Sequence, residues 1–159
     1  MLADTHRKAD DDRPLPDPVE VELARVDLVL HAGDVVSHPL LDRLAVGAPV
    51  HAVLGNNDDG TLVGELPDDL ELDFDGVRVA MVHDSGARQG RADRMRRRFP
   101  DADIVVFGHS HDPVDEVGTD GQRLFNPGSP THRRRQPQPS YGLLEITDGH
   151  LSRHEIVRF

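Results

Sequence analysis

The chain has 159 residues and contains no cysteine. Disulfide bonds and thiolate metal sites are therefore excluded, and any bound metal ion must be held by imidazole, carboxylate or amide groups or by backbone oxygen. No apolar run reaches the about 20 residues that a membrane-spanning helix needs, and the first residues lack the pattern of a signal peptide. We therefore expect a cytoplasmic protein that does not act at a membrane.

Lysine and aromatic residues are scarce. Lys8 is the only lysine among 18 basic residues, and the 29 acidic residues give a net charge of −11. This composition is typical of proteins adapted to high salt and encoded by GC-rich genomes, so we expect a halophilic protein. An acidic surface repels phosphate backbones, which argues against nucleic acid as a partner, although strong salt would screen that repulsion. With five phenylalanines and one tyrosine, the loops offer no aromatic cluster that would select a nucleoside.

The length is that of one domain, and residues 1–159 contain neither an internal repeat nor a linker. In the first half, apolar runs alternate with segments that have helix-start signals. We expect strands at Asp27–Ala32 and Pro49–Leu54 and helices at Pro18–Arg25 and Pro39–Leu44. Asp17 is the expected N-cap of the first helix. Strands that alternate with helices favour parallel pairing.

Three Asp-Gly pairs punctuate the second half, at Asp75-Gly76, Asp120-Gly121 and Asp148-Gly149. Asp-Gly between two strand-like runs is a strong hairpin signal, so we expect antiparallel pairing there. One helix is expected at Gly90–Phe99. It carries four crowded arginines, namely Arg94, Arg96, Arg97 and Arg98. These arginines either form a solvated face or bind phosphate, and the sequence leaves both open.

The segment Ile104–His111, with the sequence I-V-V-F-G-H-S-H, is the centre of the pattern. Its four apolar residues predict a buried strand, and His109 and His111 follow directly after Gly108. In open α/β sheets, ligands collect at the carboxyl ends of strands. We therefore expect both imidazoles to face one cavity, unless they are exposed histidines of an ordinary turn.

Four more polar groups follow strand-like runs in the same way. They are Asp4 with His6, Asp34, Asn56 with Asn57, and His83. Each has an ordinary alternative, respectively a frayed terminus, a helix cap, a tight turn and a buried core histidine. If the strands share a sheet and a direction, however, all of these side chains meet at one edge. Such a set without sulfur suits Mn, Fe, Co, Ni or Zn better than Ca, and it suits two ions that share a carboxylate.

In this order, the motifs D-T-H, G-D, G-N-N-D, a single histidine after a strand, G-H-S-H and N-P-G-S resemble those of the calcineurin-like metallophosphoesterases. The chain is most similar to the small, cap-less phosphodiesterase branch of bacteria and archaea, and the similarity runs from residue 4 to residue 135. It implies an α/β fold with four layers, an α/β/β/α sandwich of two mixed β-sheets flanked by helices. The turn Asn126–Ser129 would shape the edge of the site.

The resemblance also implies a role for each candidate residue. One metal ion would bind Asp4, His6 and His111, the other would bind Asn56, His83 and His109, and Asp34 would bridge them. The catalytic group would comprise Asp34, Asn56 and His109. Two ions about 3.5–4 Å apart would lower the pKa of a bridging water, and the resulting hydroxide would attack phosphorus in line. The implied enzyme is a metal-dependent phosphodiesterase for a small phosphoester, with manganese as first choice and nickel, cobalt, iron or zinc as alternatives.

Two features depart from the family pattern. Asn57 stands where many relatives carry a histidine that protonates the leaving group, which predicts a preference for good leaving groups. We expect Asn57 and Arg133 to contact the substrate. Three residues precede Asp4, where the family has a full strand. We therefore expect either a true start upstream of Met1 or a shortened first strand, and a higher melting temperature after upstream extension.

Two other functions remain open. The retromer scaffold subunit resembles this fold and binds partners with little or no catalysis, and nucleases of the same superfamily process nucleic acid. Scaffold members tend to lose metal ligands, whereas every ligand position is filled here, which favours an enzyme. The nucleases add DNA-binding elements for which this short acidic chain has little room. The natural substrate and homo-oligomer formation cannot be read from the sequence.

Overall fold

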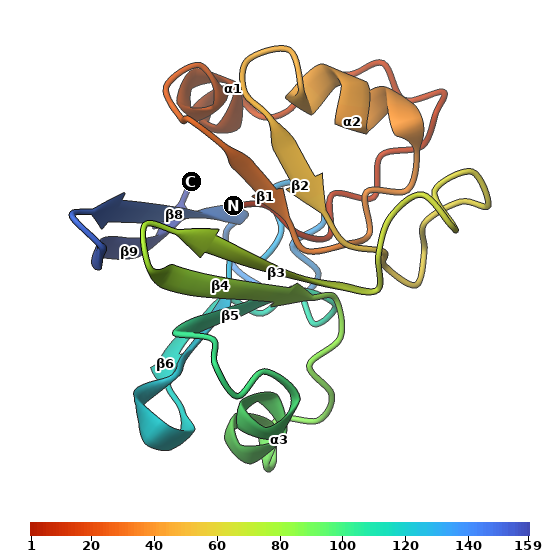
Figure 1. The fold of residues 1–159 in the computed structure, drawn as a ribbon. Helices are drawn as coiled ribbons and strands as arrows, with labels where there is room; N and C mark the ends of the chain where they lie inside the picture. Colours follow the sequence, from red (N-terminus) through yellow and green to blue (C-terminus); the bar gives the residue numbers. More distant parts are fainter.

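A five-stranded mixed sheet lies at the centre of the computed structural model, which describes residues 1–159 (Figure 1). Its strand order is β3-β4-β5-β7-β6. The strands are β3 (Asp69–Phe74), β4 (Val77–Val82), β5 (Ile104–Phe107), β6 (Val114–Val117) and β7 (Arg123–Asn126). β4, β5 and β7 run parallel, and the two edge strands β3 and β6 pair antiparallel with their neighbours. All four residues of β5 are buried, as the apolar run predicts.

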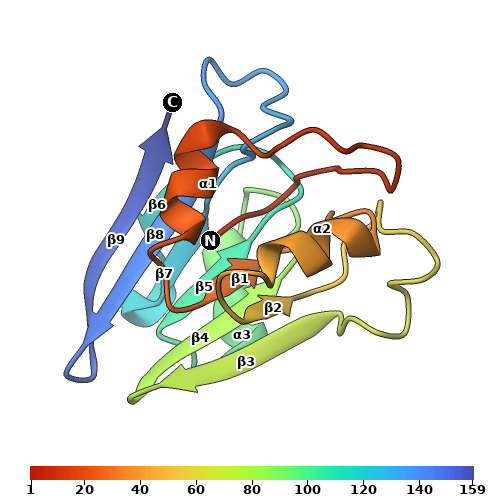
Figure 2. The same cartoon turned by 90° about the horizontal axis from the view of Figure 1, so that it is seen from above.

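The second layer of β-structure combines one short and one long strand pair. β1 (Val29–His31) and β2 (Val50–Ala52) pair in parallel, and β8 (Ser140–Thr147) and β9 (His150–Arg158) form a long antiparallel hairpin. The first residues of the chain lie between these pairs. Leu2 forms a parallel bridge with His31, and Met1 exchanges backbone hydrogen bonds of 2.6 and 3.0 Å with Gly142. Figure 2 shows the N-terminus enclosed between β1 and β8.

Three helices cover the outer faces of the two sheets. α1 (Asp17–Leu23) and α2 (His38–Leu44) lie above β1 and β2, and α3 (Arg91–Arg98) lies below the five-stranded sheet (Figure 1). The longest of them has eight residues, too few for a helix to cross a bilayer.

Three groups of buried apolar side chains hold the layers together. One contains Leu40 and Leu44 of α2, one lies between the sheets around Met81 and Phe125, and one packs Met95 of α3 onto the five-stranded sheet. These layers confirm the predicted α/β/β/α sandwich of two mixed sheets.

The element predictions need two corrections. Asp17 is not an N-cap, because the amide of Val19 donates to the carbonyl of Pro16 (2.8 Å) and the first turn of α1 therefore begins at Pro16. The three Asp-Gly hairpins are present, but antiparallel pairing does not describe the whole second half. α3 is a crossover between β4 and β5, so these two strands run parallel.

Three of the four arginines singled out on α3 contact the protein's own surface, and Arg96 does so through Asp120 at 3.4 Å. Arg94 donates to the carbonyl of Ser85 through Nε (2.9 Å) and Nη2 (2.7 Å), and Arg98 pairs with Asp69 at 2.7 Å. These contacts favour the solvated structural face over a phosphate-binding role.

Candidate metal centre

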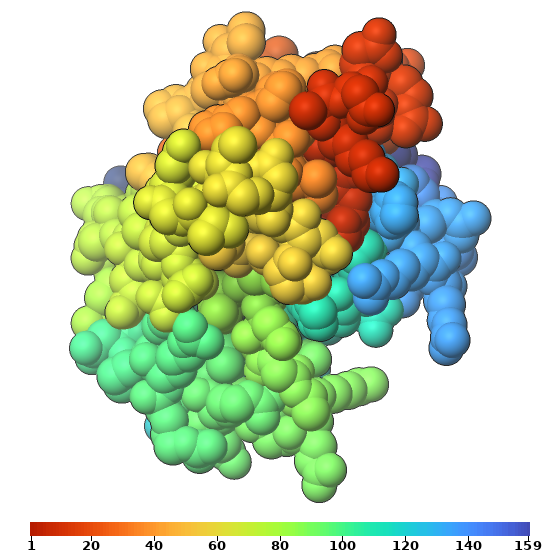
Figure 3. All heavy atoms as spheres, turned by 90° about the vertical axis from the view of Figure 1, so that its right-hand side faces the viewer, coloured from red at the N-terminus to blue at the C-terminus, as the bar shows by residue number.

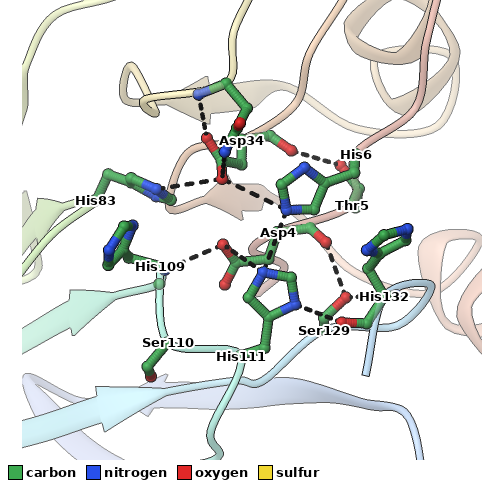
Figure 4. A network of polar contacts seen from close by, with 12 residues as sticks. Asp4, Thr5, His6, Asp34, His83, His109, Ser110, His111, Ser129 and His132 are labelled. Carbon is green, nitrogen blue, oxygen red and sulfur yellow. Dashed lines mark hydrogen bonds and ion pairs between the residues drawn. The ribbon is translucent and has the colours of Figure 1, made fainter. Parts of the chain in front are cut away.

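The polar motifs after five strand ends meet on one face of the molecule. Asp4 and His6 follow the Leu2 bridge, and the other groups follow β1, β2, β4 and β5. In the space-filling view, the N-terminal loop, the loop after β2 and the loop around residues 130–138 surround this face (Figure 3). All seven residues predicted as metal ligands join one network of contacts, most of which Figure 4 shows. Asn56 and Asn57 are exposed, so the network is open to solvent.

Five of these residues have a left-handed backbone conformation, which directs their side chains into the network. The φ angles are 55° at Asp4, 48° at His6, 57° at Asp34, 65° at His109 and 59° at His111. This conformation costs an L-residue about 1–2 kcal/mol, so surrounding contacts must enforce it. The amide of Asp4 donates to the carbonyl of Gly33 (3.0 Å), and that of His6 donates to the carbonyl of Asp34 (3.0 Å). The loops are therefore fixed by their neighbours.

Two glycines allow the loops to approach so closely. A Cβ at Gly33 would lie 2.5 Å from Nδ1 of His83, and Gly33 has a φ of +85°. A Cβ at Gly55 would lie 2.1 Å from the backbone nitrogen of Asp34. Steric crowding therefore explains why the G-D and G-N-N-D motifs contain glycine, independently of any bound ion.

Asp34 lies at the middle of the network. Its Oδ2 is 3.4 Å from Nε2 of His6 and 3.4 Å from Nε2 of His83. Asn57 donates to both carboxylate oxygens, through its backbone amide and its side-chain Nδ2, each at 2.8 Å. Burial favours the neutral carboxyl, but hydrogen bonds from His83 and Asn57 outweigh it and hold the pKa of Asp34 below its usual range. Asp34 is therefore ionised at neutral pH.

Asp4 is fully buried and only half satisfied. Its Oδ1 accepts the amide of His109 (3.0 Å) and lies 3.5 Å from Nε2 of His111, whereas Oδ2 has no hydrogen-bond partner. Burial raises the pKa of Asp4 to about 7. A buried carboxylate oxygen without a donor is costly. A cation beside it would remove that cost, so this residue fits a metal site.

The first half of the site, which we call the Asn56 half, comprises Asn56, His83 and His109. Nδ1 of His83 bonds to the carbonyl of Ala32 (2.8 Å), which leaves Nε2 facing the amide oxygen of Asn56 at 3.0 Å. Nδ1 of His109 contacts the same oxygen at 2.8 Å. Burial opposes the charged form of His83, but Asp34 and the Ala32 carbonyl outweigh it and raise its pKa. Without an ion, a second proton on His83 therefore satisfies these acceptors.

The second half, which we call the Asp4 half, comprises Asp4, His6 and His111. Nδ1 of His111 bonds to the backbone carbonyl of His132, so its Nε2 carries the lone pair. That nitrogen lies 3.2 Å from Nε2 of His6, and the two rings stack with centroids 5.0 Å apart. Burial lowers the pKa of His111 to about 4, so the imidazole is neutral and available as a ligand at neutral pH.

The sequence interpretation missed His132. Its ring centroid lies 5.0 Å from that of His6, and one ligand nitrogen from each of His6, His111 and His132 lies within 4.8 Å of the others. No strand leads into this residue, which is why the pattern of polar groups after strands overlooked it. Ser129 ends a turn that was already expected at the edge of the site, and His132 follows it by three residues. This proximity was the available signal that His132 lies at the site.

The N-P-G-S turn links two of the ligand-bearing loops. Asn126 donates through Nδ2 to the carbonyl of Gly108 (3.0 Å), and the hydroxyl of Ser129 donates to the carbonyl of Asp4 (2.8 Å). These hydrogen bonds explain how the turn shapes the edge of the site, as the sequence predicts. Arg133 is exposed, and its guanidinium donates to the carbonyl of Gln136 within its own loop. Its contact with a substrate stays a prediction.

Two curated relatives cover most of the chain. A probable metallophosphoesterase of Methanothermobacter thermautotrophicus is 35% identical over 162 residues, 99% of this chain and 90% of the relative. A probable metallophosphoesterase of Methanocaldococcus jannaschii is 34% identical over 152 residues, 93% of this chain and 75% of the relative.

Solved structures share the fold over nearly the whole chain. Vps29 of Entamoeba histolytica, a single mutant, superposes with a TM-score of 0.76 at 25% identity, covering 99% of this chain and 97% of that one. The same protein complexed with zinc gives a TM-score of 0.75 at 24% identity, covering 99% and 96%. A protein described as a novel archaeal phosphodiesterase gives 0.71 at 22% identity, covering 99% and 97%. At these identities, the last two show the fold alone.

The family comparison agrees with the motif pattern and the fold. The profile described as "Calcineurin-like phosphoesterase superfamily domain" matches residues 1–149. Since the profile and the archaeal relatives together cover almost the entire sequence, this chain belongs to the calcineurin-like phosphoesterase superfamily.

Proposed function

We propose that residues 1–159 form one phosphoesterase domain that hydrolyses a small phosphodiester with the help of two divalent metal ions. The observation that carries this proposal is the position of Asp34, whose Oδ2 lies 3.4 Å from a histidine of each half of the site. One ionised carboxylate that faces an imidazole on each side suits two ions that share a ligand.

The donor groups suit such ions. Asp4, His6 and His111 would hold one, Asn56, His83 and His109 would hold the other, and Asp34 would bind both. The buried Oδ2 of Asp4 lacks a partner, and two imidazole nitrogens face each other at 3.2 Å in the same half. Bound ions would supply Lewis acidity toward phosphate oxygens and would acidify a water molecule. We propose manganese first, with nickel, cobalt, iron or zinc as alternatives, because imidazole and carboxylate donors suit these ions.

The chain's own residues then have defined tasks. Asp34 keeps a negative charge between the two halves, because Asn57 donates to both of its oxygens. Asp34, Asn56 and His109 would lie nearest the reacting phosphate. Asn57 and Arg133 would contact the substrate, but an amide cannot supply a proton at neutral pH. The leaving group must therefore depart without an acid from position 57, which favours esters of acidic alcohols and phenols.

Hydrolysis of bis-p-nitrophenyl phosphate by metal-stripped protein in high salt tests the proposal. Mn, Ni, Co, Fe, Zn or Mg would be added back in turn to wild type, to Asp34→Ala and to the matched control Asp12→Ala, which changes an exposed loop carboxylate. We expect metal-dependent turnover in wild type and in the control, and none in Asp34→Ala. Equal turnover in Asp34→Ala would refute the proposed site.

The second candidate is an interaction module with little or no catalysis. The observation in its favour is the similarity to Vps29 over 99% of this chain. Metal binding without turnover in any of the ions, in a folded protein, would support this function over the enzyme.

A further inference from the structure

We propose that His132 is an additional ligand of the metal ion that His6 and His111 would hold. This inference rests on the proposed function, because it concerns one of the two ions. The three imidazoles form a group of their own at the open side of the site, where Figure 4 shows the ring of His132 beside that of His6.

The distances suit one shared ion. One ligand nitrogen of each ring lies within 4.8 Å of the other two. Two imidazole nitrogens on one ion lie at most about 4.2 Å apart, because each metal–nitrogen bond is about 2.1 Å. A movement of less than about 1 Å brings the nitrogens together, which rotation of an exposed side chain provides. His132 is exposed, whereas His111 is buried.

The backbone of His132 is held against the two ligand-bearing loops. Its amide donates to the hydroxyl of Ser129 (2.8 Å), and that hydroxyl donates to the carbonyl of Asp4 (2.8 Å). The neighbouring Thr131 donates through Oγ1 to the carbonyl of Thr5 (2.6 Å). The carbonyl of His132 accepts Nδ1 of His111. Four contacts therefore fix the main chain at the site and leave the imidazole itself free.

The ring of His132 differs in its surroundings from two half-buried histidines, His38 and His154. His38 lies 2.8 Å from a carboxylate oxygen of Glu65, and His154 lies 2.7 Å from one of Asp115. The ring of His132 has two imidazoles as neighbours instead, at centroid distances of 5.0 and 6.2 Å. Three imidazole nitrogen donors prefer zinc, nickel or cobalt to manganese. His132 would therefore bias the Asp4 half toward these ions.

Cobalt titration of metal-stripped protein, followed by calorimetry and visible absorption, tests the inference without an activity assay. We expect two bound ions in wild type. In His132→Ala, the affinity for one of them should fall by at least about tenfold, since even residues that contact ligands indirectly have effects of that size. His150→Ala, which changes an exposed histidine at the start of β9, is the matched control and should bind like wild type.

A cysteine at the same position gives a direct signature. The chain has no cysteine of its own, so in His132→Cys any thiolate-to-cobalt charge-transfer band must come from residue 132. Arg133→Cys changes the next exposed position and should give no such band.

Unchanged affinity for both ions in His132→Ala overturns the inference, as does an equal charge-transfer band in Arg133→Cys. Failure of wild type to bind any ion would instead refute the proposed function, and the inference with it.

Discussion

The two halves of the site differ in how well they are satisfied without an ion. In the Asn56 half, the imidazole nitrogens that face the site have a hydrogen-bond partner, because His83 and His109 both contact the amide oxygen of Asn56. In the Asp4 half, a carboxylate oxygen has no partner and two imidazole nitrogens face each other. A proton on His83 completes the first half, whereas the second half has an unpartnered carboxylate oxygen above pH 7, when Asp4 is ionised, and a metal ion would satisfy it. We therefore infer that the Asp4 half binds its ion more tightly.

The largest effect is expected from Asp34→Asn, which removes the charge that both halves share. Loss of the bound ions should reduce kcat/KM for bis-p-nitrophenyl phosphate by about 10³-fold, because metal ions supply several kcal/mol of transition-state stabilisation. Steady-state kinetics combined with metal analysis measures both quantities. Retention of two ions by this variant would contradict a shared carboxylate.

Asp4→Asn should change how the stability of the metal-free protein depends on pH, which tests the Asp4 half alone. In the metal-free fold, the pKa of Asp4 is raised from 3.8 to about 7, so its ionisation destabilises the fold progressively as pH rises from 4 to 7. The metal-free variant should therefore be more stable than metal-free wild type at pH 8, by up to about 4 kcal/mol, and the difference should shrink toward pH 4. Urea unfolding at several pH values measures it.

With metal added, wild type should become more stable than Asp4→Asn at pH 8. Wild type gains stability from an ion in the Asp4 half, and Asp4→Asn should gain much less, whereas Asn56→Ala should keep most of the gain. If Asn56→Ala loses more of the metal-dependent stabilisation than Asp4→Asn, the Asn56 half binds its ion more tightly, contrary to our inference.

Gly55→Ala disturbs the loop that carries Asn56. The added Cβ would meet the backbone nitrogen of Asp34, and neither backbone can move without displacing the site. We expect a loss of about 1–3 kcal/mol in unfolding free energy. Gly60→Ala is the matched control, because its Cβ would meet no atom within 4 Å and should leave stability nearly unchanged.

Asn57→Ala should have the smallest effect. The backbone amide still donates to Asp34, and the Nδ2 contact of 2.8 Å is lost together with the proposed contact to the substrate. The cost is about 1 kcal/mol, or roughly fivefold in kcat/KM. In wild type, a series of substituted phenyl esters should show rates that fall steeply as the leaving-group pKa rises. If the rates do not depend on the leaving-group pKa, a group other than Asn57 must protonate the leaving group.

The sequence could predict most of the site because the signal is local. Each motif follows an apolar run, so Asp34 and His83 could be selected without coordinates. The expectation of one shared sheet was wrong, because Asp34 follows β1 of one sheet and His83 follows β4 of the other. His132 follows a turn rather than a strand, and that rule therefore missed it. The parallel pairing of β4 with β5 was missed because an Asp-Gly pair reports its own hairpin and nothing about distant partners.

Other expectations concern properties that the fold does not test. The cytoplasmic location, the adaptation to high salt, the choice of manganese and the oligomeric state come from composition or resemblance, and they stay predictions. The α/β/β/α layers could be predicted because the motifs identify the family, whereas the ends of α1 depend on one hydrogen bond from Val19 to Pro16.

The left-handed residues of the site lead us to expect that the protein's abundance depends on metal supply. Asp4, His6, Asp34, His109 and His111 each hold a backbone conformation that glycine would adopt more cheaply. Folding therefore carries a standing free-energy cost, which ligand binding to the folded state offsets in proportion to the logarithm of free metal concentration. In cells starved of the ion, a larger fraction of molecules would be open to proteolysis, so the amount of this protein should follow the metal it uses.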